Sequence, residues 1–125
     1  MAAFPTCSPA GDQLLRLRRE IHRLGMIVRV AGEIDLLSHL ELRAEVFDAC
    51  DAVRPPTPVV LDLTDVEFLA SVGLTELLLC HERASIARTP LRVVASDRRV
   101  LRPIEVTGLS GLLDIYPNVD EALAA

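Results

Sequence analysis

Ser71 stands where a run of strand-forming residues gives way to a helical repeat, and its hydroxyl has the clearest chemical use in this sequence. The apolar, β-branched run at 59–63 is typical of a strand that is covered on both faces. Beyond the serine, Leu74, Leu77 and Leu78 recur at helical spacing. A hydroxyl in the first turn of a helix can accept bonds from free N–H groups as a cap. If phosphorylated, it would hold about two negative charges where the helix dipole favours an anion.

Other side chains that often do chemistry form no convincing site in this sequence. His22, His39 and His81 share no metal-ligand spacing and fall on different predicted elements. Ser71, His81 and Asp62 make a hydrolase triad on paper, but the chain has no Gly-x-Ser-x-Gly elbow. It has no Gly-rich phosphate loop either. The sequence therefore predicts a protein that is not an enzyme and has no metal or cofactor of its own.

The cysteines Cys7, Cys50 and Cys80 are odd in number and lack metal-ligand spacing, as is usual in a reducing compartment. Cys50 and Cys80 lie in apolar helical contexts and are expected to fill the core. Cys7 lies in a stretch with Pro and Ser and is expected to be exposed. A redox role for these thiols stays open as an alternative.

Length and charge limit the class of protein. A chain of 125 residues predicts one compact domain, and a net charge of −5 without a basic stripe excludes nucleic acid as a direct partner. No apolar run reaches the roughly 18 residues that span a bilayer. Residues 1–12 lack the charged start and apolar centre of a secretory signal. We therefore expect a cytoplasmic protein that does not bind membranes.

Periodicity and turn residues divide the chain into a tail and one domain. Residues 1–12 contain Pro and Gly without periodicity and are expected to form a flexible tail before a single domain at 13–125. Ser38 and Glu41 have the spacing of a capping box. Strands are expected at 14–19, 26–31, from 59, 91–94 and 112–116. Helices are expected after Ser38, after Ser71, at 98–107 and near the end through Leu123. Polar residues are expected to interrupt the strands at 32–35 and at 64–65, and Phe68, after the second break, is expected in the core.

This β-β-α-β-α-β-α-β order predicts an α/β fold. Strands that are separated by helices pair in parallel through right-handed crossovers. The first two strands follow each other through a short loop at Gly25 and form a hairpin. The expected architecture is a mixed, mostly parallel sheet with the helices packed mainly on one face.

Three motifs fall in the order of a known family. They are Gly-Glu-Ile-Asp at 32–35, Leu-Asp-Leu at 61–63 and Phe-Leu-Ala-Ser-Val-Gly-Leu at 68–74. With them, the chain from about residue 14 to its end resembles the STAS domain, and most closely the bacterial anti-sigma factor antagonists. The segment at 102–109 also resembles the third-helix region of actinobacterial members.

The resemblance implies a regulatory binding protein. Members of this family bind an anti-sigma factor that is also a serine kinase, and the binding frees a sigma factor. The kinase phosphorylates the serine of an Asp-Ser-x-Gly-Leu motif, which releases the antagonist, and a serine phosphatase resets it. By this match Ser71 is the phosphorylated residue, and Glu33, Asp35, Ser71, Gly73 and Leu74 belong to the partner-binding face. A monomer or weak homodimer is expected.

The match also leaves some residue roles open. The family usually has Asp before the serine, where this chain has Ala70. Two consequences are open: slower phosphorylation, or a binder that phosphate no longer switches. Gly73 fits close approach of a partner or simple packing, Glu33 and Asp35 fit partner contact or a solvated turn, and Asp62 fits the capping of a nearby loop.

Two other functions remain as alternatives. Related domains form scaffold or signalling subunits that assemble with copies of themselves and are not switched by phosphorylation. Others are proposed to bind a small anion or a nucleotide in the cleft near the phosphorylated helix.

Overall fold

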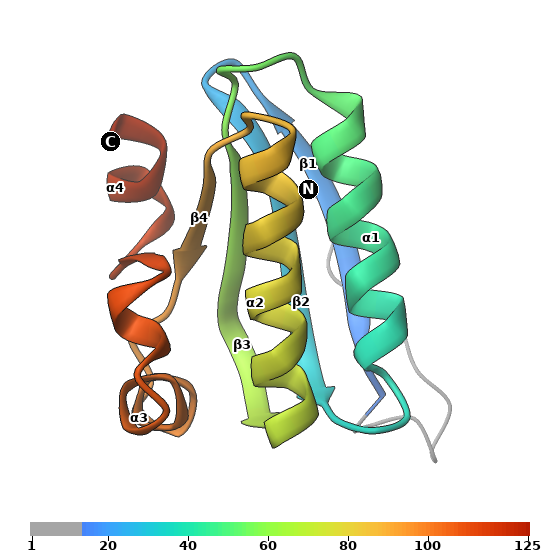
Figure 1. Ribbon diagram of the computed structural model, residues 1–125, viewed down its shortest axis with the longest axis vertical. Helices are drawn as coiled ribbons and strands as arrows, with labels where there is room; N and C mark the ends of the chain where they lie inside the picture. Colours follow the sequence, from blue (N-terminus) through green and yellow to red (C-terminus); the bar gives the residue numbers. More distant parts are fainter. Residues whose placement is uncertain (1–13) are drawn as a thin grey trace.

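The computed structural model describes residues 14–125; the expected tail at 1–12, with Cys7, lies outside the described residues. Its elements follow the predicted order (Figure 1). They are β1 (Arg16–His22), β2 (Gly25–Ile34), α1 (His39–Ala52), β3 (Val59–Leu69), α2 (Ser71–Ile86), β4 (Leu91–Val94), α3 (Arg98–Val106), the 3-10 turn η2 (Leu109–Gly111), β5 (Asp114–Tyr116) and α4 (Val119–Ala124).

The five strands form one sheet in the order β1-β2-β3-β4-β5. β1 pairs with β2 antiparallel, and the other neighbours pair in parallel. The connections between the parallel strands carry α1, α2 and α3, as crossover connections require. The predicted mixed, mostly parallel α/β fold is confirmed.

Alternate residues of the central strands face two different cores. In β3, Val59, Leu61 and Leu63 belong to the large core that also contains residues of α1, α2 and α3. Val60 points the other way and packs with Leu123 of α4. Helices α1 and α2 lie side by side over one face of the sheet (Figure 1). The helices therefore pack mainly on one face, with only the short α4 on the other.

Both strand breaks expected from the sequence are wrong. β2 continues through Gly32 and Glu33 and ends only at Ile34, with register shifts around Gly32. That glycine has a φ of +99°, and a Cβ on it would lie 2.3 Å from the carbonyl oxygen of Leu14. β3 continues through 64–65, and Phe68, expected in the core, is 50% exposed. Pairing with β2 along β3 outweighs the local polar signal.

The capping box expected at the start of α1 does not form, because its hydrogen bonds are absent. Ser38 is the cap residue, but its side chain makes no bond to the first turn of the helix. Its hydroxyl donates to the Glu33 carbonyl oxygen at 2.7 Å and accepts from the Asp35 N–H at 3.0 Å. The side chain thus closes the loop before the helix. At α3, by contrast, Asp97 caps the first turn as expected.

Candidate functional site

The carboxyl ends of β2 and β3 meet at one end of the sheet, where the start of α2 follows (Figure 1). The backbone N–H of Ala70 donates to the carbonyl oxygen of Ile34 at 2.9 Å. Ser71 follows one member of this pair, and the β2–α1 loop, residues 35–38, follows the other. Crossover topology therefore places the predicted phosphorylation site beside the predicted acidic loop. Carboxyl ends of parallel strands are where such folds commonly bind their ligands.

Ser71 is the first residue of α2, and its side chain is exposed. The cap residue is Ala70, with extended backbone at φ −77° and ψ 167° and no side-chain cap bond. The cap alternative for Ser71 is therefore wrong. The first helical bonds run from the N–H groups of Gly73 and Leu74 to the Ala70 carbonyl oxygen. The N–H groups before them, at Ser71 and Val72, are the donors that an anion at this helix start would meet.

Gly73 and Leu74 are buried. A Cβ on Gly73 would lie 2.6 Å from Cδ1 of Leu69 and 2.7 Å from Cγ2 of Ile34. The structure therefore favours packing for Gly73: it lets α2 start directly over the ends of two strands. Leu74 is 8% exposed and lines a hollow beside Ser71.

Asp35 organises the β2–α1 loop. Its Oδ1 accepts from the N–H groups of Leu37 at 3.0 Å and Ser38 at 3.2 Å. Asp35 and Glu33 are half-buried, and both line a hollow of about 210 Å³ together with Glu41. The hollow is therefore acidic. The Asp35 carboxylate already holds the loop through its two hydrogen bonds, and this structural role is compatible with contact to a partner.

Sequence reasoning missed the apolar side chains of this end. Leu36 is 76% exposed, Leu37 91% and Leu40 58%. We call these three residues the leucine apex. The signal was present in the sequence, because two leucines directly follow Asp35 before the helical repeat of α1 begins. Large apolar side chains gathered in exposed positions mark interaction sites.

A second hollow, of about 330 Å³, lies on the other side of Ser71. It is lined by Ser71, Leu74, Thr75, Leu78, Thr107 and Leu109. Its walls are mostly aliphatic, and no basic side chain lines it. A small anion or nucleotide would meet no cation there, so this lining gives no support to the nucleotide alternative.

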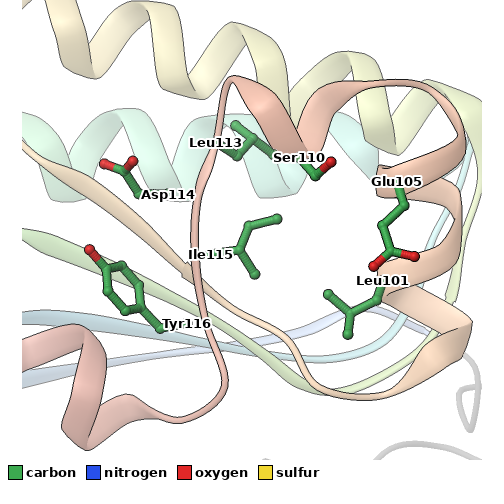
Figure 2. A pocket seen from close by; sticks show the side chains of 7 residues that line it. All are labelled: Leu101, Glu105, Ser110, Leu113, Asp114, Ile115 and Tyr116. Atoms are coloured by element: carbon green, nitrogen blue, oxygen red, sulfur yellow. The ribbon is translucent and has the colours of Figure 1, made fainter.

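A third hollow lies elsewhere, between α3, η2 and β5. Figure 2 shows its lining residues, Leu101, Glu105, Ser110, Leu113, Asp114, Ile115 and Tyr116. The hollow measures about 370 Å³ and contains two carboxylates and no basic group. None of the predicted site residues lines it. It therefore offers a phosphate no charge complement either.

Asp62 makes hydrogen bonds within the sheet and is not part of the candidate site. It is 6% exposed, and its carboxylate accepts from Arg29 Nη1 at 2.6 Å and from the Thr64 N–H at 3.1 Å. Hydrogen bonding to Glu20 raises the pKa of the Arg29 guanidinium, so this cation stays charged. Because its neighbours in β3 face α2, Asp62 faces the opposite side of the sheet. The fold therefore does not bring Asp62 together with Ser71 and His81, and no hydrolase triad forms from these three residues.

A buried ion cluster near the site was also missed. Glu76 of α2 is 1% exposed and accepts from Arg43 Nε and Nη2, both at 2.8 Å, and pairs with His39 Nδ1. Burial by itself raises the pKa of Glu76, but hydrogen bonds from Arg43 and His39 outweigh it and hold that pKa below its ordinary value. The carboxylate is therefore ionised. No single helix shows this cluster in its sequence, because its members come from two helices.

The two described cysteines are buried and free, as expected of core residues. Burial raises the pKa of the Cys80 thiol to about 12 and also raises that of Cys50. Both thiols are therefore protonated, which gives them little reactivity. Within residues 14–125 no group of His, Cys, Asp and Glu is arranged to hold a metal ion, and no helix is long and apolar enough to cross a membrane.

Comparisons with known proteins agree with this fold. The STAS domain family profile matches residues 16–122. A Mycobacterium tuberculosis protein that is named as an anti-anti-sigma factor is 33% identical over 78% of this chain and 66% of its own length, so the chain spans just under two thirds of that relative. The anti-sigma-F factor antagonist RsfA of the same species is 29% identical over 83% of this chain and 81% of its own. The crystal structure of an anti-sigma factor antagonist from Mycobacterium paratuberculosis superposes with a TM-score of 0.81 at 34% identity, covering 90% and 94% of the two chains.

Proposed function

Since the chain belongs to the STAS domain family, we propose that it is an anti-sigma factor antagonist switched by phosphorylation of Ser71. It binds an anti-sigma factor that is also a serine kinase, and the bound kinase gives up its sigma factor. Transfer of phosphate to Ser71 ends the interaction, and a serine phosphatase restores the binding form. Relatives named as anti-sigma factor antagonists support this assignment.

One observation carries the proposal: Ser71 is exposed at a helix start, next to a surface suited to a protein partner. The leucine apex supplies apolar contact area on one side of it. Glu33, Asp35 and Glu41 make the same end acidic. A partner surface that combines basic and apolar side chains would complement this end in charge and character.

Phosphorylation suits this position physically. The N–H groups of the first turn and the positive end of the α2 dipole stabilise a phosphate on Ser71, so the fold tolerates it. A partner shaped for a neutral hydroxyl would instead meet about two negative charges and lose several kcal/mol of association through desolvation and repulsion. The same modification therefore preserves the domain and releases the partner.

Of the two consequences left open for Ala70, we favour slower phosphorylation of Ser71. A carboxylate at that position would lie beside the Ser71 hydroxyl and could orient it for transfer. Ala70 supplies no such group, and its side chain makes no cap bond. We expect a cognate kinase that tolerates the methyl group and transfers phosphate slowly.

Incubation with recombinant anti-sigma factor kinases and ATP, followed by mass mapping, tests the proposal. Phosphate is expected on Ser71, absent from Ser71→Ala, and unaffected by Ser85→Ala, which changes another exposed serine of α2. Ser71→Asp should weaken kinase binding by at least about tenfold, while Ser71→Ala binds normally. Equal affinity of Ser71→Asp and Ser71→Ala, or phosphate only on other residues, would contradict it.

A further inference from the structure

The ion cluster of Glu76, Arg43 and His39 joins α1 to α2 close to Ser71. Glu76 lies five positions after Ser71 in the chain, a turn and a half along α2. Its two oxygens both accept from Arg43 at 2.8 Å, and one also pairs with His39. His39 and Arg43 are four positions apart, so they share one face of α1. The first half of α1 is thus bound to the first half of α2.

Stability alone is a weak reason for such a cluster. Replacing a buried ion pair with well-packed apolar residues is often neutral or stabilising, whereas fixing the register of two elements is the best attested use of buried ionic groups. The remaining core residues of α1 and α2 include the small side chains Ala49, Cys50, Cys80 and Ala84. Apolar contacts of this kind have little directional preference, whereas a bidentate guanidinium–carboxylate pair has a fixed geometry.

A shift of α1 along α2 would move the leucine apex. α1 begins at His39, directly after the loop at 35–38, and Leu40 lies in its first turn. The loop is held to the helix by Asp35, whose carbonyl oxygen accepts from the N–H of His39 at 3.0 Å. The start of α2 is fixed separately, through Ala70 and Ile34. Arg83 and Asp51 pair at 2.8 Å toward the other ends of the same two helices. The cluster is therefore the polar tie between α1 and α2 that lies nearest the site, and it adds to the Ala70–Ile34 bond in placing the apex beside Ser71.

We infer that Glu76 is a positioning residue for partner binding: through Arg43 and His39 it holds the leucine apex in place beside Ser71, so that one partner contacts both. This inference rests on the proposed function. It assigns a task to a residue that is 1% exposed and therefore too buried to contact a partner itself. Its signature is a loss of partner affinity that does not follow the loss of stability.

The first test replaces the cluster's strong pair with apolar side chains, Glu76→Leu with Arg43→Met. The melting temperature is expected to stay equal or rise. Affinity for the anti-sigma factor kinase that phosphorylates Ser71 is expected to fall about tenfold, the size of a typical coupling between sites. Glu76→Gln is the second variant, because it keeps the shape of the side chain while removing its charge.

The second test needs no partner. Amide hydrogen exchange at Leu37 and Ser38, whose N–H groups donate to Asp35, reports on the order of the loop. In the double variant Glu76→Leu with Arg43→Met, which is expected to keep its stability, we expect faster exchange there and unchanged exchange in β3. Leu123→Ala is the control, because it weakens the second core on the opposite face of the sheet. It should lower the melting temperature without changing loop exchange or affinity.

The outcomes separate the inference from the proposed function. Unchanged affinity in the apolar double variant overturns the inference and leaves the proposed function standing, as does an equal loss of affinity in Leu123→Ala. If the unmodified protein binds none of the kinases, the proposed function fails. Loop exchange then decides the structural part alone: faster exchange supports the positioning role of Glu76, and unchanged exchange overturns it.

Discussion

The N–H of Ala70 donates to the carbonyl oxygen of Ile34 at 2.9 Å, and this single bond brings two distant parts of the sequence together. Asp35 follows one residue of the pair and Ser71 follows the other. The acidic loop and the candidate phosphorylation site therefore sit side by side at the carboxyl end of the parallel strands. The sequence predictions of these two features came from separate motifs, and the sheet unites them.

Gly73→Ala is expected to destabilise the domain, although alanine is favoured over glycine by about 1 kcal/mol in a helix interior. The added methyl group would lie 2.6 Å from Leu69 and 2.7 Å from Ile34, both of which are buried. Overpacking of this kind costs about 1–3 kcal/mol and exceeds the gain in helix propensity. Urea denaturation measures the difference in the free energy of unfolding.

Gly111→Ala is the matched control for that experiment. A Cβ on Gly111 meets no atom within 4 Å, and its φ is not positive. Its free energy of unfolding is expected to stay within about 0.5 kcal/mol of the unmodified protein. A Gly73→Ala variant as stable as this control would contradict the close packing of α2 on the two strands.

Ala70→Asp is expected to stabilise the domain and to speed phosphorylation of Ser71. Ala70 has the extended backbone of a helix cap but no side-chain acceptor. Replacing alanine with a good capping residue is worth about 1 kcal/mol. The carboxylate would also stand beside the Ser71 hydroxyl. Thermal denaturation measures the first effect, and the rate of phosphate transfer from the kinase measures the second.

Ala70→Asn separates the two effects. Asparagine caps a helix about as well as aspartate but has no charge. It should raise the melting temperature similarly and leave the transfer rate close to that of the unmodified protein. Equal transfer rates for Ala70→Asp and Ala70→Asn would show that the carboxylate has no part in phosphorylation.

Much of the fold could be predicted from the sequence, because it depends on local patterns. The strand before Ser71 and the helix after it follow from apolar runs at their own periods. Asp97 and Asn118 cap α3 and α4, and the capping positions were recognisable from residue type. The parallel pairing follows from the alternation of strands and helices.

The remaining features depend on tertiary partners. Phe68 looks like a core residue in its motif, yet it faces solvent at the end of β3, because the register of a strand decides which side is buried. Ser38 and Glu41 match a capping box, but the loop competes for the serine hydroxyl. From its own helix, Glu76 would be predicted to be an exposed charged residue, and only the packing of α1 shows that it pairs with Arg43. Such pairings between elements have no signature within either element.

The stability of the domain should fall in acid partly through Glu76. Its pKa in the folded protein is lowered from 4.5, because hydrogen bonds from Arg43 and His39 outweigh the opposing effect of burial. Ionised Glu76 therefore stabilises the fold above pH 4.5, and this contribution is lost as the pH falls through the lower, folded-state pKa. Urea denaturation from neutral pH to acid, with the unmodified protein and Glu76→Gln, measures it.

The expected difference between these two proteins is about 1–3 kcal/mol at neutral pH, because Glu76→Gln loses the charge-assisted hydrogen bonds of a buried carboxylate, while the half-buried Arg43 can remain hydrated. It should shrink as the pH falls below 4.5. Glu82→Gln, an exposed position on the same helix, should lie within about 0.5 kcal/mol of the unmodified protein at each pH. A Glu76→Gln difference that stays constant across the range would exclude Glu76 as an acid-sensitive group.

The leucine apex should matter for binding and not for folding. Leu37 is 91% exposed, so Leu37→Ser removes little buried surface and should change the free energy of unfolding by less than about 0.5 kcal/mol. If Leu37 becomes buried against the partner, its loss should cost about 1–2 kcal/mol of binding, a factor of about 5 to 30 in Kd. Calorimetric titration with the anti-sigma factor kinase measures the change.

Ile86→Ser is the control, since Ile86 is 82% exposed at the far end of α2, and this variant should bind the kinase with unchanged Kd. Equal Kd values for the two variants would place the partner somewhere other than the leucine apex.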